Sequence, residues 1–115
     1  MRTNNGIQVD STVYTLPENE DELVTYSVYM GGDIGESVIT TNRPKLPNIL
    51  IYGDSFTNPL ETLLWTQANE LQSIDFRYYT QSTLKDYITE HKPDIVICVR
   101  DETVFLSEAG NGITE

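Results

Sequence analysis

A serine placed to act as a nucleophile follows the short apolar segment formed by residues 49–52. Gly53, Asp54 and Ser55 come directly after this segment, and Asn58, a residue suited to capping a helix, follows closely. In an open α/β sheet, ligands and catalytic groups sit in the crevice outside the carboxyl ends of the strands. A buried strand that ends in this turn would present the Ser55 hydroxyl at such a crevice. Ser55 is therefore the candidate catalytic nucleophile.

A serine nucleophile also needs a base that takes its proton and donors that stabilise the oxyanion. The sequence contains a single histidine, His91, at the end of a predicted helix. Because this end of the helix leads into the next strand, we expect His91 at the amino ends of the strands, on the side opposite Ser55. There it serves as a polar helix terminus, where a cation suits the helix dipole. No Ser-His-Asp triad can be assembled from these residues.

Asp54 and Arg100 are further candidate site residues. The Asp54 carboxylate could accept backbone N–H bonds within its turn, or it could bind a metal or accept a phosphoryl group. The phosphoryl role is disfavoured, because the sequence has no second acid two positions away and no Gly-rich phosphate loop. Arg100 follows a predicted strand and could hold a carboxylate or oxyanion of a ligand, or form a surface ion pair. We expect Gly53 and Arg100 to bind ligand, and we predict no cofactor and no metal.

Strand and helix patterns alternate through the second half of the chain. Residues 49–52, 74–79 and 95–99 are predicted strands, and two helices are predicted between them. The first helix starts with Asn58 as its cap and Glu61 as the reciprocal capping residue. Its apolar stripe has the members Leu60, Leu63, Leu64, Ala68 and Leu71. The second helix is capped by Ser82 or Thr83 and stopped by Pro93.

This β-α-β-α-β order with short connections predicts a parallel sheet. The second strand lies on one side of the first, nearer an edge, and the third strand lies on the other side. The lone cysteine, Cys98, falls within the third strand and is expected to be buried as a small apolar residue.

The first half of the chain shows weaker patterns. Residues 24–30 alternate between apolar and polar side chains, residues 31–35 form a turn, and residues 37–41 return as a partner strand. Residues 8–16 are a further possible strand. The predicted fold is therefore α/β: an open, mostly parallel βαβαβ sheet with helices on its faces, preceded by an N-terminal β-hairpin region. We expect a single domain with a β-rich segment at 1–47, a core at 48–106 and a tail at 107–115.

Composition narrows the possible partners. The chain has 115 residues, a size that suits one domain, and its 18 acidic and 7 basic residues give a net charge of −11. Such a surface repels nucleic acids and anionic lipids, so neither is an expected partner. No apolar stretch reaches the roughly 20 residues that a membrane helix needs.

The segment Gly53-Asp54-Ser55-Phe56 resembles the nucleophile block of the SGNH hydrolases, the GDSL-type esterases and acyltransferases. A longer pattern, over residues 22–106, resembles the C-terminal part of DHHW-type proteins and their relatives among the alginate O-acetyltransferases. The blocks that carry it are residues 26–32, 39–41, 48–56, 60, 74–79 and 93–97. The resemblance implies a three-layer SGNH-like fold, with Ser55 as nucleophile and Asp54 as its turn partner.

In that branch the catalytic Asp and His come from an Asp-x-His segment upstream of the serine. No histidine precedes Ser55 here, and none follows His91. The resemblance therefore implies a truncated domain, a fragment of an SGNH-like esterase or O-acyltransferase that is inactive by itself. It implies a carbohydrate or acyl-ester substrate and a location outside the cytoplasm, in the cell envelope or secreted, in a bacterium.

Two other interpretations stay open. The chain could be a non-catalytic binding or assembly domain with a flavodoxin-like fold, with Asp54 and Arg100 in its ligand crevice. An uncovered sheet edge or apolar face would also favour a homo-oligomer.

Overall fold

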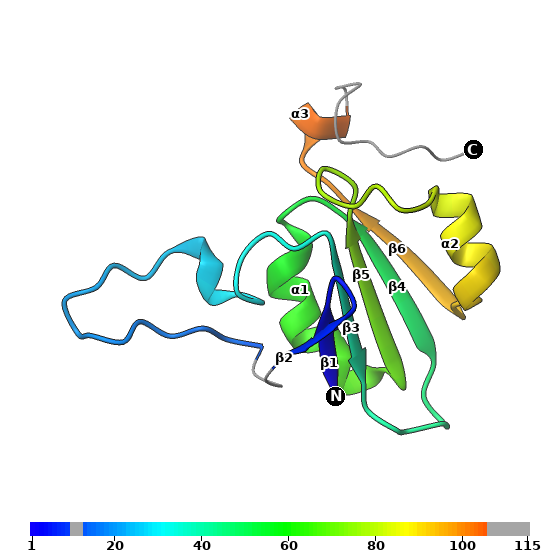
Figure 1. Cartoon of the computed structure of the whole chain (residues 1–115), viewed down its shortest axis with the longest axis horizontal. Coiled ribbons are helices and arrows are strands. Elements are labelled where there is room, and N and C mark those ends of the chain that lie inside the picture. The colour runs from blue at the N-terminus through cyan, green and yellow to red at the C-terminus, as the bar shows by residue number, and fades with distance from the viewer. Residues whose placement is uncertain (10–12, 106–115) are drawn as a thin grey trace.

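The computed structural model describes residues 1–9 and 13–105, which form a six-stranded open sheet with helices packed on both faces (Figure 1). The strands lie in the order β2-β1-β3-β5-β4-β6. Their bounds are β1 Arg2–Asn4, β2 Ile7–Val9, β3 Glu36–Thr40, β4 Asn48–Gly53, β5 Glu70–Asp75 and β6 Ile95–Val99. The α-helices are α1 Thr57–Leu64, α2 Leu84–His91 and the short α3 Glu102–Phe105. Two 3₁₀ turns, η1 Tyr26–Val28 and η2 Trp65–Gln67, complete the described elements.

The predicted alternation of strand and helix is confirmed for β4, α1, β5, α2 and β6. Strand β4 pairs in parallel with β5 on one side and β6 on the other, as expected. The prediction of a mostly parallel sheet is wrong, because the β1–β2, β1–β3 and β3–β5 pairings are antiparallel. Strand β3 adds antiparallel to β5, so β5 is an internal, largely buried strand and does not lie near an edge.

Strand β5 occupies Glu70–Asp75 and not the predicted residues 74–79, of which 76–79 lie beyond the strand. The boundary between α1 and β5 therefore also differs from the prediction. Helix α1 ends at Leu64, and Ala68 is already extended, with φ −118° and ψ 149°. Arg43 donates to the carbonyl oxygens of Trp65 and Ala68, which stabilises this early end. Leu71, assigned to the helical stripe from its spacing, is therefore a buried residue of β5. Tertiary hydrogen bonds thus override a continuous helical pattern.

The N-terminal hairpin is built from other strands than those predicted. It joins β1 and β2 through Asn5 and Gly6, both at positive φ, the residue pair that two-residue hairpin turns favour. Residues 24–30, predicted as a strand, contain η1 and a single bridge between Tyr14 and Tyr29. Residues 36–40 do form a strand, but it pairs with β1 and β5 because no strand from 24–30 is available to it.

Two apolar clusters pack on opposite faces of the sheet. The cluster on the α1 face contains Met30, Ile39, Ile49, Ile51, Ala68 and Leu71. The cluster on the α2 face contains Leu50, Ile74, Phe76, Tyr79, Leu84 and Tyr87. Thr83 caps α2 by accepting the Asp86 N–H, as the sequence predicts. No helix among the described residues combines the length and apolar character needed to cross a membrane.

Edge strand β6 is poorly covered by either helix. Ile95 and Val96 are each 43% exposed, and Cys98 is exposed as well. The prediction that Cys98 is buried is therefore wrong. Its apolar neighbours in sequence suggested a core strand, but within residues 1–9 and 13–105 β6 has a neighbouring strand on one side only.

Helix α1 buries a polar face and exposes part of its apolar one. Its buried residues are Thr57, Asn58, Glu61 and Thr62, whereas Leu60 and Leu63 are 39% and 63% exposed. Asn58 does not cap the helix, since its amide donates to the Gly32 carbonyl oxygen at 3.2 Å. The predicted capping box and apolar stripe are therefore both wrong.

The buried carboxyl of Glu61 links α1 to the sheet. Its Oε1 accepts hydrogen bonds from the Thr57 and Ser73 hydroxyls, each at 2.6 Å. Burial raises the pKa of Glu61, and the hydrogen bonds from Ser73 and Thr57, together with the charge of Arg2, partly offset this effect. Arg2 is itself buried and donates to the Met30 carbonyl and the Ser37 hydroxyl.

We predict that Glu61→Gln removes a pH-dependent loss of stability. Because burial raises the Glu61 pKa above its ordinary value of 4.5, the folded state holds this proton more tightly than the unfolded state. The stability that this proton gives is complete below pH 4.5 and is lost as the pH rises from there to the folded pKa. In urea titrations the variant should gain stability over the wild type through that range.

The matched control is Glu90→Gln, which changes an exposed glutamate on α2. It reports the effect of the same substitution at an exposed position. A difference between Glu61→Gln and the wild type that varies with pH no more than that of Glu90→Gln would contradict the prediction.

Candidate functional site

The Gly53-Asp54-Ser55 turn lies at the carboxyl end of β4, between the end of β6 and the start of α1. Asp54 is buried, with 2% of its surface exposed, and Ser55 is half-buried. The Asp54 Oδ1 accepts the Phe56 N–H at 2.9 Å, and its Oδ2 accepts the Asp101 N–H at 2.7 Å. The carboxylate therefore ties the turn that holds Ser55 to the segment that follows β6.

The same turn requires a glycine at position 53. A Cβ atom built on Gly53 would lie 1.6 Å from the Val99 carbonyl oxygen and 2.7 Å from the Val99 carbonyl carbon. That oxygen also accepts the Asp54 N–H, at 3.4 Å. At the carboxyl end of β4, the β6 backbone thus lies closer than a side chain on Gly53 would permit.

An open hollow of about 400 Å³ lies beside this turn. Phe56, Pro59 and Leu60 line it from the α1 side, and Val99, Arg100 and Asp101 line it from the β6 side. The Arg100 guanidinium stands 5.4 Å from the centre of the Tyr52 ring. Hydrogen bonds from Thr103 lower the pKa of Asp101, which favours its charged form. The hollow therefore combines apolar walls with one cationic and one anionic side chain.

His91 lies far from this turn. It ends α2, just before β6 begins, and its ring stacks on Tyr87 with centroids 4.0 Å apart. Ser55 follows the carboxyl end of β4, which is parallel to β6, so the two residues are separated by about the length of β6, roughly 16 Å for five residues. Proton transfer requires contact or one bridging water. His91 is excluded as the base for Ser55.

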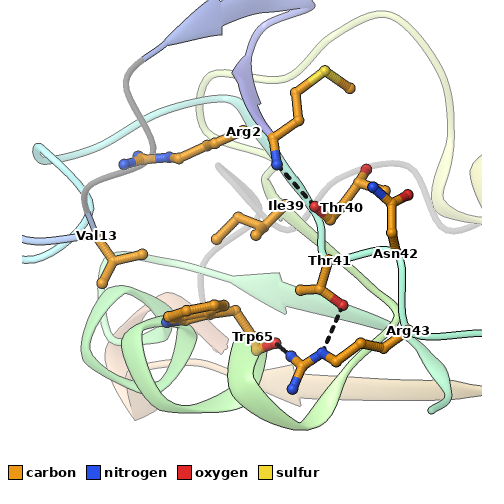
Figure 2. A pocket seen from close by; sticks show the side chains of 9 residues that line it. Arg2, Val13, Ile39, Thr40, Thr41, Asn42, Arg43 and Trp65 are labelled. Atoms are coloured by element: carbon orange, nitrogen blue, oxygen red, sulfur yellow. Dashed lines mark hydrogen bonds between the residues drawn. The ribbon is translucent and has the colours of Figure 1, made fainter.

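A second cavity, of about 380 Å³, lies at the opposite end of the sheet (Figure 2). Arg2, Val13, Ile39, Trp65 and residues 40–43 surround it, together with Met1. Arg43 donates to the Thr41 hydroxyl and to the Trp65 carbonyl, and Figure 2 shows both bonds at the cavity wall. These contacts fix the end of α1, so the polar groups here have structural roles.

The structure therefore brings together Gly53, Asp54 and Arg100 beside Ser55. Phe56, Pro59 and Leu60 were not predicted as lining residues, and Leu60 was assigned to a helix stripe facing the core. The exposure of Leu60 depends on which face of α1 is buried, and nothing in the local pattern shows that the polar face packs inward.

Comparison of the fold with solved structures gives clear matches. Bacillus cereus PatB1 carrying a sulfonyl adduct superimposes with a TM-score of 0.66 at 21% identity, over 77% of this chain and 31% of that one. A second PatB1 structure gives 0.65 at 23% identity, over 74% and 28%. A DHHW family protein from Eubacterium siraeum gives 0.64 at 21% identity, over 77% and 28%. The chain shares their fold.

The resemblance to DHHW proteins noted from sequence blocks is thus matched by a structural likeness to a DHHW protein. The chain spans less than a third of the length of these proteins. No family profile matches the sequence, and no curated protein matches it.

We predict that Gly53→Ala destabilises the fold by about 1–3 kcal/mol, as overpacking a filled site does. The new methyl group would overlap the Val99 carbonyl and push β6 away from β4. Gly35→Ala is the comparison, because a Cβ there meets no atom closer than 3.1 Å. Urea unfolding should show the larger loss for Gly53→Ala, and equal or reversed losses would contradict this account of the close approach.

Proposed function

We propose that this chain is the nucleophile-bearing part of an SGNH-like esterase or O-acyltransferase domain, with Ser55 as the nucleophile and Asp54 as its positioning partner. One observation carries the proposal. Ser55 follows a strand with parallel neighbours on both sides, and the adjacent Asp54 carboxylate is held by two backbone N–H groups. A nucleophile that is fixed in place before the substrate arrives avoids an entropic cost in the reaction.

The hollow beside the turn suits an acyl ester. The apolar side chains of Phe56, Leu60 and Val99 can cover an acyl chain or the apolar face of a sugar ring. Arg100 supplies a positive charge for a carboxylate of the substrate or for the oxyanion that develops during acyl transfer. Gly53 lets the Val99 backbone approach β4 closely, and Val99 and Arg100 form one wall of the hollow.

The structural likenesses support the same chemistry. A sulfonyl adduct forms when a nucleophilic side chain displaces a leaving group from a sulfonyl reagent, and PatB1, which has this fold, carries such an adduct. By analogy with the family named from the sequence, the substrate is an O-acylated or acceptor carbohydrate outside the cytoplasm of a bacterium. The analogy concerns the fold, and the chemistry is assigned through Ser55.

The proposal requires a base from elsewhere. His91 is the single histidine of the chain and lies at the wrong end of the sheet. A catalytic histidine for Ser55 would therefore come from outside this chain, and the chain alone would be a slow catalyst. Loss of the base from a catalytic triad leaves only a small residual rate enhancement.

A second candidate is a non-catalytic binding or assembly domain. The observation that favours it is the same separation of His91 from Ser55, together with the use of both Asp54 oxygens in backbone hydrogen bonds. In this case the hollow binds a ligand and Ser55 has no chemical role.

We predict that added imidazole restores ester hydrolysis in a manner that depends on Ser55. Imidazole supplies the missing base, so the rate of p-nitrophenyl acetate hydrolysis by the chain should rise with imidazole concentration above the rate of imidazole alone. Ser55→Ala should abolish this increment, because the variant lacks the hydroxyl oxygen that would attack the ester.

His91→Ala is the matched control and should leave the increment unchanged. Equal rates for the wild type and Ser55→Ala at every imidazole concentration would refute the enzyme proposal and favour the binding domain.

A further inference from the structure

Residues 13–30 form an arm that projects away from the sheet (Figure 1). At the base of the arm its two sides run antiparallel. The Thr15 N–H donates to the Val28 carbonyl oxygen at 2.8 Å, and the Met30 N–H donates to the Val13 carbonyl oxygen at 2.9 Å. Met30 is buried in the apolar cluster on the α1 face. The base of the arm is therefore fixed to the body of the molecule.

Three tyrosine rings lie together at this base. Tyr14 is opposite Tyr29 in the antiparallel pair, so the two side chains lie on the same face of it. The Tyr29 ring lies 6.3 Å from the Tyr14 ring and 5.5 Å from the Tyr26 ring between centroids, at interplanar angles of 59° and 69°. Tyr14 and Tyr26 are 46% and 44% exposed. A ligand can therefore reach ring faces that point in different directions.

The arm itself is strongly acidic. The segment between Tyr14 and Tyr26 contains no basic residue. It contains four exposed acidic residues, which are Glu18, Glu20, Asp21 and Glu22. A surface with charges of one sign attracts ligands of the opposite sign. The arm thus draws cations toward the tyrosine rings at its base.

The body of the molecule also gives a negative potential at Tyr26. Burial raises the pKa of the Tyr26 hydroxyl, and Tyr29 and the carboxyl groups of Asp54, Asp33 and Glu61 raise it further. Arg77 lies 3.4 Å from Asp33 and offsets part of this negative charge. The Tyr26 hydroxyl therefore keeps its proton, and the surrounding charges favour a cation beside the ring.

These features suit an organic cation better than a metal ion. A cation is attracted to the face of an aromatic ring within about 6 Å of its centre, and quaternary ammonium groups are bound by several rings together. Metal ions such as calcium need several close oxygen ligands, and the described residues contain no group of acidic, histidine or cysteine side chains that could hold one. Within residues 1–9 and 13–105, cation–π contacts occur at Tyr78 and Tyr52 and not at the rings of the arm.

We propose that the cluster of Tyr14, Tyr26 and Tyr29 binds an organic cation that carries a quaternary or methylated ammonium group. The inclined rings surround the bulky, apolar surface of such a group, and the acidic arm supplies the complementary charge. An uncharged apolar group of the same shape gains the contact without the electrostatic attraction. The proposal does not depend on a catalytic role of Ser55.

A pair of ligands that differ only in charge tests the proposal. Choline and 3,3-dimethylbutan-1-ol have the same shape, but the alcohol has a carbon atom in place of the charged nitrogen. Each is titrated into the wild-type chain at low salt, and the tyrosine ring proton resonances are followed by NMR. Choline should shift these resonances with saturation, and its dissociation constant should be at least about fivefold lower than that of the alcohol.

Substitutions separate binding by the rings from general attraction to a chain of charge −11. Tyr26→Leu keeps an apolar side chain but removes the ring, so it should remove most of the preference for choline. Tyr26→Phe keeps the ring and should keep the preference. Tyr78→Leu is the matched control, because Tyr78 is also exposed but its ring already has the Arg77 guanidinium 5.3 Å from its centre. This variant and Ser55→Ala should bind choline as the wild type does.

Tyr26 is exposed, so Tyr26→Leu should fold, and urea unfolding checks this. If that variant does not fold, Tyr14→Leu repeats the test on the other side of Tyr29. Equal affinities of the wild type for choline and the alcohol would overturn the proposal. So would a preference for choline that persists without the ring, or one that Tyr78→Leu reduces equally.

Discussion

The carboxylate of Asp54 holds the end of the sheet together. It accepts one N–H from the start of α1 and one from the segment after β6, so a single buried side chain fixes three elements around Ser55. The arrangement works because Gly53 has no side chain and lets the Val99 carbonyl approach β4 closely. Because both carboxylate oxygens receive N–H donors, these hydrogen bonds offset the cost of burying the Asp54 side chain. The position of Ser55, the hollow beside it and the path of the chain beyond β6 all depend on this contact.

The polar face of α1 is the second unusual feature of the molecule. A surface helix normally buries its apolar stripe, whereas α1 turns Thr57 and Glu61 toward Ser73 of β5 and leaves Leu63 exposed. The buried hydroxyl–carboxyl contacts satisfy the polar groups, so the helix packs without a large penalty. As a result, Leu60 and its neighbour Phe56 face outward beside the Ser55 turn. An apolar helix face that would otherwise lie in the core thus becomes part of a hollow beside the candidate site.

His91 and Ser55 lie at opposite ends of the parallel pair of strands β4 and β6. The chain contains the strand and turn that position Ser55. It covers less than a third of the length of the PatB1 and DHHW structures that share its fold. The described residues place no histidine beside Ser55 and no strand at the outer edge of β6. If Ser55 is the nucleophile, its histidine therefore comes from polypeptide outside this chain.

Local sequence signals determined much of the second half of the protein. The apolar run before Gly53, the Thr83 cap and Pro93 were enough to place β4, α2 and β6, because each depends on the residues themselves or on near neighbours. The Asn5-Gly6 turn between β1 and β2 is an equally local signal, although no hairpin was predicted there. Only the tertiary structure decided which face of α1 is buried, where β5 begins and where β3 pairs. Those outcomes depend on Ser73, Arg43 and β1, which are distant in sequence, and helical or strand periodicity carries no information about such contacts.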